Sequence, residues 1–156
     1  LVTINVGVND VWHAFFDFPN SQLYPQGNLP TGVPLAEYRE KLTQMVQAAQ
    51  AAGIRVVLLS PTPIREVLDG PENRKLKEYI ATMREVGLQN KCLFIDINAP
   101  FREVIGTFQK HAGKTLNLLA ADGVHPNQSG YRIIAFTILR GLGVPTKDIE
   151  NLQVKN

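Results

Sequence analysis

Short apolar runs alternate with amphipathic helical patterns along most of this chain, and this alternation limits the folds that it can adopt. Apolar runs with strand character occupy residues 1–6, 54–59 and 92–97. Apolar residues at helical spacing predict helices over about 35–52, 73–86, 100–110 and 127–140. Such alternation is typical of a parallel sheet covered by helices. We therefore predict an α/β fold whose ligand crevice lies beyond the carboxyl ends of the strands.

The chain is predicted to form one domain over residues 1–143, followed by a polar, loose tail over residues 144–156. Its length of 156 residues suffices for a domain with a core of its own. The first residues, Leu-Val-Thr-Ile, already have the character of a buried strand. We therefore expect the domain to be incomplete at its N-terminus, with a further segment preceding Leu1.

Residues 11–34 show no regular pattern and are predicted to form a long irregular segment interrupted by four prolines. Its aromatic residues are Trp12, Phe15, Phe16, Phe18 and Tyr24. Long loops in compact domains are often functional, so these side chains either line a substrate groove or cap the hydrophobic core. The sequence leaves both alternatives open.

Composition argues against several classes of function. The formal net charge is +2 and the basic residues are scattered, which gives no footprint for nucleic acid. No apolar run reaches the roughly 18–20 residues that span a membrane. The histidines at 13, 111 and 125 lack metal-ligand spacing, and no glycine-rich phosphate loop is present. We therefore predict no metal and no cofactor.

The segment Ala121-Asp122-Gly123-Val124-His125-Pro126-Asn127 places a carboxylate three residues before an imidazole, at a predicted turn ahead of the last helix. At this spacing the Asp122 carboxylate can fold back onto Nδ1 of His125 and leave Nε2 facing outward. A histidine held in this way is an effective general base near neutral pH. The pair alone is weak evidence, because an aspartate that caps a turn beside an exposed histidine has the same sequence.

The segment Gly7-Val8-Asn9-Asp10 follows the first predicted strand. A side-chain amide at this place can donate a hydrogen bond to an oxyanion. Asn-Asp after a strand is also ordinary turn chemistry, so this segment too is ambiguous when taken alone.

Together the two segments resemble the SGNH hydrolases, a superfamily also called GDSL. The resemblance rests on Gly-x-Asn-Asp after a strand and on Asp-x-x-His-Pro-Asn-x-x-Gly-Tyr at the last helix. Ser60-Pro61-Thr62-Pro63 after the middle strand and Phe94-Ile95-Asp96 in the next strand extend it across residues 1–142. It implies a three-layer α/β/α sandwich with a flavodoxin-like parallel sheet.

By the same resemblance, each matching residue has an expected role. His125 would be the general base, and Asp122 would orient it. Asn9 would donate its side-chain amide to the oxyanion, and Gly7 would shape the turn before it. Asp10 would be structural and would tie down the loop around Asn9.

The sequence departs from the superfamily pattern at the nucleophile. The Gly-Asp-Ser stretch and the glycine that supplies a backbone oxyanion donor are both absent from these residues. The serines present are Ser21, Ser60 and Ser129, and none has the expected surroundings. Either the sequence is the C-terminal portion of a longer hydrolase, which we favour, or it is a degenerate member.

The expected function is therefore a serine ester hydrolase that acts on small acyl or acetyl esters of carbohydrates, short alcohols or lipids. Its expected partner is a small-molecule ester, together with the missing N-terminal segment of the same protein, without which these residues would be inactive. Two alternatives remain open: a non-catalytic binding protein on a degenerate hydrolase fold, and an acyltransferase on the same fold.

Overall fold

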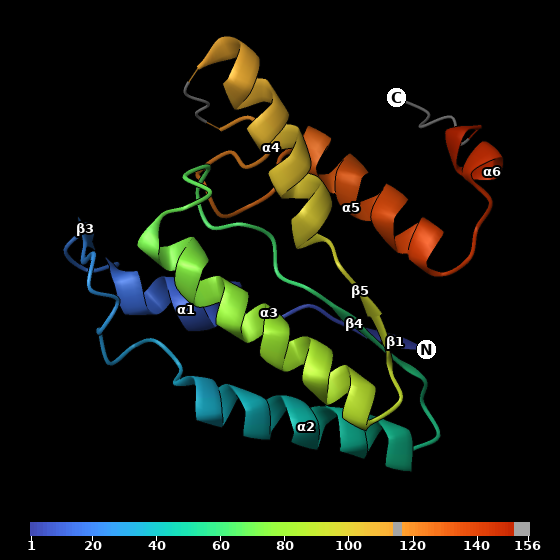
Figure 1. Cartoon of the computed structure of the whole chain (residues 1–156). Coiled ribbons are helices and arrows are strands. Elements are labelled where there is room, and N and C mark those ends of the chain that lie inside the picture. Colours follow the sequence, from blue (N-terminus) through green and yellow to red (C-terminus); the bar gives the residue numbers. More distant parts are fainter. Residues whose placement is uncertain (114–116, 152–156) are drawn as a thin grey trace.

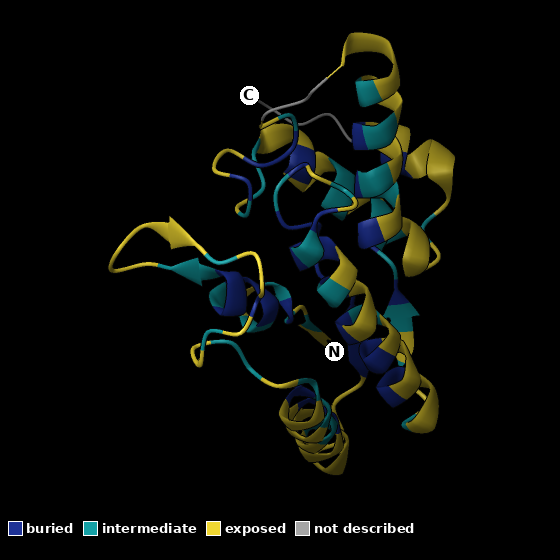
Figure 2. Cartoon of the chain, turned by 60° about the vertical axis from the view of Figure 1, so that its left-hand side comes forward, coloured by how far each residue is buried: buried dark blue, intermediate teal, exposed yellow. Residues whose placement is uncertain are grey.

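The computed structural model describes residues 1–113 and 117–151. A parallel sheet with the strand order β1-β4-β5 forms its centre (Figure 1). The three strands are β1 (Val2–Ile4), β4 (Val56–Leu59) and β5 (Leu93–Ile95). A small antiparallel hairpin joins β2 (Phe16–Asp17) to β3 (Gln22–Leu23) and projects from the body of the protein (Figure 2). The helices are α1 (Val8–Phe15), α2 (Leu35–Ala51), α3 (Pro71–Gln89), α4 (Asn98–Ala112), α5 (Gln128–Gly141) and α6 (Thr146–Glu150).

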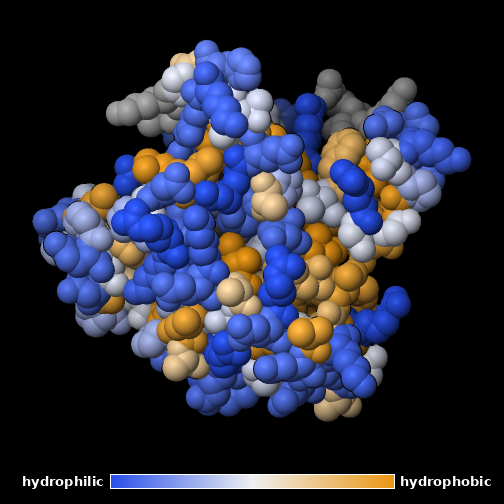
Figure 3. Space-filling model, viewed as in Figure 1, coloured by the Kyte–Doolittle hydropathy of each residue, from blue (hydrophilic) through white to orange (hydrophobic). Residues whose placement is uncertain are grey.

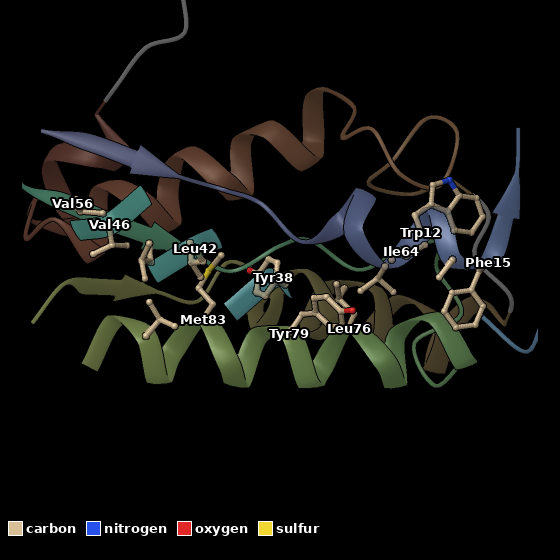
Figure 4. Close-up of a cluster of buried hydrophobic side chains, with 14 residues drawn as sticks. Trp12, Phe15, Tyr38, Leu42, Val46, Val56, Ile64, Leu76, Tyr79 and Met83 are labelled. Carbon is tan, nitrogen blue, oxygen red and sulfur yellow. The ribbon is translucent and has the colours of Figure 1, made fainter. Parts of the chain in front are cut away.

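Strand β4 lies at the centre of the sheet, and all four of its residues are buried. Because side chains alternate along a strand, Val56 and Leu58 face one side while Val57 and Leu59 face the other. The first pair joins a core cluster with α1, α2 and α3, which Figure 4 shows in part. The second pair joins a cluster with α4 and α5. Helices thus cover both faces of a parallel sheet, and the predicted three-layer α/β architecture is confirmed.

The predicted helices all form, with bounds that differ by a few residues. The largest difference is in α3, which continues through Gly87 to Gln89, beyond the expected end at about residue 86. A Cβ atom at Gly87 would lie 3.3 Å from Leu58 Cδ1. This glycine therefore serves the close approach of α3 to the sheet rather than a helix stop.

The expectation of an irregular segment over residues 11–34 is wrong at its start. Val8, Val11, Trp12 and Phe15 fall at i, i+3, i+4 and i+7, which is the period of a helix, and they lie in α1. The prolines that suggested a loop all follow the end of this helix. The hydrophobic period was present in the sequence, but the later prolines obscured it.

The tail was expected to be loose from residue 144 onward, and this is wrong for its first part. Residues 146–150 form α6, and Ile149 is buried where α6 packs near α5. One apolar side chain with a place to pack is enough to order this short turn of helix. Residues 152–156 lie outside the described part of the chain, and the domain boundary at residue 143 stays a prediction.

Strand β1 was expected to be covered on both faces, but Val2 and Thr3 are exposed. Within the described residues, β1 pairs with β4 and no strand pairs with its other edge. Near the start of the strands, Leu1, Ile54, Leu93 and Leu142 line a hollow of about 650 Å³. Apolar atoms reach the surface on this side of the molecule (Figure 3).

Helix α5 is less buried than its pattern predicted. The apolar pattern of this helix places Tyr131 and Ala135 on the same inward face as Ile134 and Ile138, yet the first two are exposed and the other two are half-buried. The expected core face of α5 thus extends past the part of the sheet that the described residues supply. None of the helices in residues 1–113 and 117–151 is long and apolar enough to cross a membrane.

Candidate active site

The turn that carries Asp122 and His125 is closed by backbone pairing at its base. Ala120 and Pro126 form an isolated antiparallel bridge, and the Ala121 N–H donates to the His125 carbonyl at 3.0 Å. Gly123 has a φ of 88°, a conformation that costs little for glycine. Backbone pairing thus closes the base of the turn that carries the two side chains.

Within this turn the Asp122 carboxylate accepts three hydrogen bonds from residues that follow it. Oδ1 accepts the backbone N–H groups of Val124 at 2.9 Å and His125 at 2.8 Å. Oδ2 lies 2.7 Å from Nδ1 of His125. The His125 backbone N–H, the imidazole and the Val124 N–H hold the pKa of the Asp122 carboxyl well below its usual range. Asp122 is therefore ionised at neutral pH.

An ionised carboxylate can only accept hydrogen bonds, so the proton of the neutral imidazole lies on Nδ1. Nε2 then carries a free lone pair, and the His125 side chain is 79% exposed. The expected geometry of this pair is confirmed, and the arrangement can accept a proton from a hydroxyl group placed at Nε2.

The residues after the pair fix the start of α5. Asn127 caps the helix, and its Oδ1 accepts the backbone N–H groups of Ser129 at 3.0 Å and Gly130 at 3.1 Å. A Cβ atom at Gly130 would lie 2.3 Å from the Leu119 carbonyl oxygen. Asn127 and Gly130 therefore hold α5 tightly against the base of the turn.

Gly7 and Asn9 lie at the start of α1. Gly7 is the N-cap residue, with a φ of 121°, and a Cβ atom there would lie 3.2 Å from Pro61 Cγ. Only glycine combines that backbone conformation with so close a neighbour. Asn9 was expected in a turn but lies in the first turn of the helix, where its side chain is exposed at the positive end of the helix dipole.

Asn9 and His125 line the same cavity, which has a volume of about 560 Å³. The cavity is lined by Asn9, Trp12, His13, Phe16, Phe18, Ser21, Leu23, Arg65, Asp122, Val124 and His125. A second hollow of about 360 Å³ also has both Asn9 and His125 in its wall. The expectation that the two segments meet at one end of the sheet is confirmed.

Asp10 is absent from the wall of the larger cavity, but it lines the smaller hollow together with Asn9 and His125. Its carbonyl accepts the Val33 N–H at 3.0 Å, which links α1 to the segment before α2. Burial, and then the negative charge of Asp10, raise the pKa values of the Tyr38 and Tyr79 hydroxyls. These two rings pack together in the core with centroids 4.9 Å apart (Figure 4). The expected role of Asp10 in supporting Asn9 stays a prediction.

Two of the three serines have structural environments. Ser60 is fully buried, donates to Asp96 Oδ1 at 2.9 Å, and accepts the N–H groups of Ile97 and Asn98. Its hydroxyl ties the end of β4 to the end of β5. Ser129 lies in the first turn of α5. Ser21 lines the cavity from the β2–β3 hairpin, with a φ of 50°.

The aromatic residues of the N-terminal segment serve both roles that the sequence left open. Phe15 is buried in the core, whereas Phe16 and Phe18 line the cavity. Trp12 belongs to both, and it stacks on Phe16 with ring centroids 5.0 Å apart and an angle of 9° between the planes. Much of one wall of the cavity is therefore aromatic.

From the sequence, His13 follows Trp12 near Asn9 and could face the groove, although a surface or packing role was favoured; Arg65 was not identified, and both line the cavity. The His13 ring contacts Phe18 edge-on, and the helical period of α1 could have placed it beside Asn9. Arg65 comes from the loop after β4, and no local pattern signals its position. In the described part of the chain, no three His, Cys, Asp or Glu side chains lie together so that they could hold a metal ion.

Comparison with known proteins identifies the relatives of this site. The model of the GDSL-like lipase/acylhydrolase family matches residues 1–133.

The chain belongs to this family.

An acetylxylan esterase from Geobacillus stearothermophilus is 30% identical over 142 residues, which cover 91% of this chain. An isoamyl acetate-hydrolyzing esterase from Saccharomyces cerevisiae is 25% identical in an alignment of 162 residues that covers 99% of this chain.

Family members of known structure share the fold. The crystal structure of a catalytic mutant of the Geobacillus acetylxylan esterase superposes with a TM-score of 0.75 and 28% identity, over 92% of this chain. Catalytic mutants of that esterase replace a serine, an aspartate or a histidine, and its aspartate precedes its histidine by three positions. This chain spans 58% and 62% of the lengths of the two curated relatives and 59% of that solved structure.

Proposed function

We propose that this chain supplies the general base, the orienting carboxylate and one oxyanion donor of a serine ester hydrolase that acts on small acyl or acetyl esters. The proposal rests on one observation: Nδ1 of His125 lies 2.7 Å from the Asp122 carboxylate, in a cavity that Asn9 also lines. The serine nucleophile would come from residues outside these 156. The three residues present would then act in the roles that the family resemblance assigns to them.

In the acylation step the serine hydroxyl attacks the ester carbonyl, and His125 Nε2 accepts its proton. The Asp122 carboxylate stabilises the imidazolium that forms and does not take up the proton itself. His125 then donates the proton to the leaving alkoxide, which departs as a neutral alcohol. The acyl group remains bound to the serine.

The negative charge of the tetrahedral intermediate needs donors that are already in place. The Asn9 side-chain amide would donate to this oxyanion, together with two backbone N–H groups from the segment that carries the serine. A water molecule, deprotonated by His125, then attacks the acyl-enzyme by the same route and releases the acid.

The relatives support an acetyl or similarly small acyl group, because the two curated relatives are named for esters of acetic acid. Their alcohols differ, one being a polysaccharide and the other a branched alkyl alcohol, so the alcohol partner of this protein stays open. The paired Asp122 and His125, with Asn9 beside them, favour catalysis over a binding protein on a degenerate fold. Binding alone gives no reason to orient an imidazole in this way.

The test compares p-nitrophenyl acetate hydrolysis by the longest translated product of the gene that contains these residues with hydrolysis by the 156-residue chain alone. We expect turnover in the longer protein only. His125→Ala should lower kcat by about 10⁶-fold. Asn9→Ala should lower kcat by about 10²–10³-fold with little change in KM.

His111→Ala is the matched control, because His111 lies at the exposed end of α4 and bonds to the Thr107 carbonyl. Wild-type turnover in the His125 variant would refute the assignment of the base. Faster loss of ester when an alcohol acceptor is added, with an acylated alcohol as product, would instead identify an acyltransferase. A longer protein that turns over no ester would leave the binding alternative.

A further inference from the structure

Arg65 and Glu66, two successive residues of the loop after β4, bond to the segment of residues 119–126, which carries Asp122 and His125. The Arg65 backbone N–H donates to the Gly123 carbonyl at 2.5 Å. The Glu66 carboxylate accepts the Leu119 N–H through Oε1 at 2.8 Å, and Glu66 is buried. Arg65 thus holds the middle of the turn, at Gly123, and Glu66 holds its base, at Leu119.

The Arg65 side chain also packs against Gly123 in the turn. An added Cβ at Gly123 would lie 3.2 Å from Arg65 Cγ and 3.4 Å from Arg65 Cα, so the glycine lies directly against the arginine. Farther out, Nη1 lies 3.5 Å from Oε1 of Glu72, in the first turn of α3. The Glu72 side chain is only 3% exposed, whereas that of Arg65 is 41% exposed.

A buried carboxylate strongly favours a nearby cation, so Glu72 restricts where the Arg65 guanidinium can lie. Arg65 also adopts a φ of 54°, which is uncommon for a residue other than glycine. Such a conformation persists where the surroundings determine it, and it often occurs near functional sites.

We propose that Arg65 is a positioning residue for the general base. Its backbone and its aliphatic stem hold Gly123, and its ion pair with Glu72 fixes the stem in place. The turn then keeps the Asp122 carboxylate on Nδ1 and Nε2 toward the cavity. This role rests on the proposed function only insofar as His125 is the base, because the orientation of the ring can be measured without any catalysis.

The first test uses this chain, with ¹⁵N-labelled histidine and NMR at a pH where the imidazole is neutral. The wild-type ring should give the widely separated ¹⁵N shifts of a single tautomer with the proton on Nδ1. In Arg65→Ala the two shifts should move toward each other, as in a mixture of tautomers. Arg65→Lys keeps the stem and the charge, and it should restore the wild-type spectrum.

Arg102→Ala is the matched control, because this arginine bonds to the Leu68 carbonyl and lies outside the turn. Glu72→Gln removes the ion pair that fixes the Arg65 stem and leaves the backbone of the turn untouched, and it should also mix the tautomers. If Arg65→Ala fails to fold, as judged by its backbone amide spectrum, Glu72→Gln decides the question. A wild-type ring spectrum in the folded Arg65→Ala variant, or in Glu72→Gln when Arg65→Ala does not fold, overturns the proposal.

The second test measures ester hydrolysis by the longer protein. A misplaced base lowers the rate of the chemical step, so Arg65→Ala should lower kcat by about 10²-fold and leave KM nearly unchanged. Arg65→Lys should recover most of this loss. A large increase in KM at constant kcat would overturn the positioning role and show that the exposed guanidinium binds substrate. If no variant or wild type hydrolyses esters, the proposed function fails, while the NMR result still decides the role of Arg65.

Discussion

At the scale of single residues, Asp122 shows how a short segment can orient a histidine side chain. Its carboxylate takes two backbone N–H groups and one ring N–H from residues within three positions. All three donors are local, so the carboxylate and the ring hold each other within the turn, and the proposed action of Arg65 is on the turn as a whole, through Gly123. The same donors lower the pKa of Asp122, which links the geometry of the pair to the pH dependence of stability.

Asp122→Asn should therefore change how stability responds to acid. A carboxyl whose pKa is lower in the folded state than in the unfolded state stabilises the protein. This stabilisation is fully present at pH values above the pKa of the unfolded state, about 3.9, and it falls as the pH drops below that pKa. The difference in the free energy of unfolding between wild type and Asp122→Asn should be largest near pH 6 and should shrink toward pH 3. Urea denaturation at several pH values measures it.

Asp148→Asn provides the control for this prediction, because Asp148 lies in the exposed short helix α6. It should show a nearly constant difference from wild type over the same pH range. A constant difference for Asp122→Asn as well would mean that the carboxylate gains nothing from its donors.

The sequence predicted this pair because its geometry depends only on a three-residue spacing. Asn9 was predicted for a similar reason, since it follows a strand by a fixed number of residues. Arg65 was not predicted, because it meets Gly123 only after β4 and α5 have packed into one structure. A contact between distant segments leaves no periodicity and no spacing for sequence reasoning to detect.

At the scale of elements, the start of α5 determines where the Asp122–His125 turn lies. Asn127 caps the helix and also donates from Nδ2 to the Leu118 carbonyl at 3.0 Å. Gly130 lets the first turn of the helix approach the Leu119 carbonyl more closely than any side chain would allow. The helix and the turn are therefore built as one unit.

Gly130→Ala should disrupt the contact between the first turn of α5 and the Leu119 carbonyl. The new Cβ would lie 2.3 Å from a backbone oxygen, so either α5 or residues 119–126 must shift. We expect destabilisation by about 2–4 kcal/mol, in the range of severe packing defects. Thermal or urea unfolding measures this change, and the His125 ring shifts report any movement of the turn.

Gly106→Ala is a suitable comparison, because Gly106 lies inside α4 and its nearest neighbour would be Leu68 Cδ1 at 3.7 Å. There the helix propensity of alanine should dominate and stabilise the protein by up to about 1 kcal/mol. Equal effects of the two substitutions would show that the close approach at Gly130 has no energetic importance.

Most elements were predictable because each carries its own hydrophobic period. The exceptions have physical causes. The start of α1 was hidden by the prolines that follow it, and α6 depends on a single buried isoleucine. The inward face of α5 was predicted only in part: Ile134 and Ile138 are half-buried, but Tyr131 and Ala135 are exposed, because burial depends on neighbouring elements that a pattern does not reveal.

At the scale of the whole molecule, helices cover the two faces of the sheet, but its edge at β1 is less protected. The outer edge of β1 is unpaired within the described residues, and Leu1 and Val2 are exposed beside it. Unpaired strand edges with apolar neighbours favour association with further strands. The 156-residue chain should therefore self-associate as its concentration rises.

Val2→Lys should weaken this association, because a charge on an edge strand opposes pairing with another strand. Light scattering after size-exclusion chromatography should show a smaller average mass for the variant at about 100 µM, with the melting temperature little changed. Leu88→Lys replaces an even more exposed apolar residue on α3 and should leave the average mass as it is in the wild type. Equal masses for wild type and both variants, all monomeric, would refute the prediction.

Because β4 is buried on both faces, its backbone should open much more slowly than that of the Asp122–His125 turn. Its backbone groups pair with strands on both sides, so exchange of its amide hydrogens requires opening of much of the core. The Asp122–His125 turn lies outside that strand and is closed by its own short backbone bridge. The amide hydrogens of this turn should therefore exchange faster than those of β4.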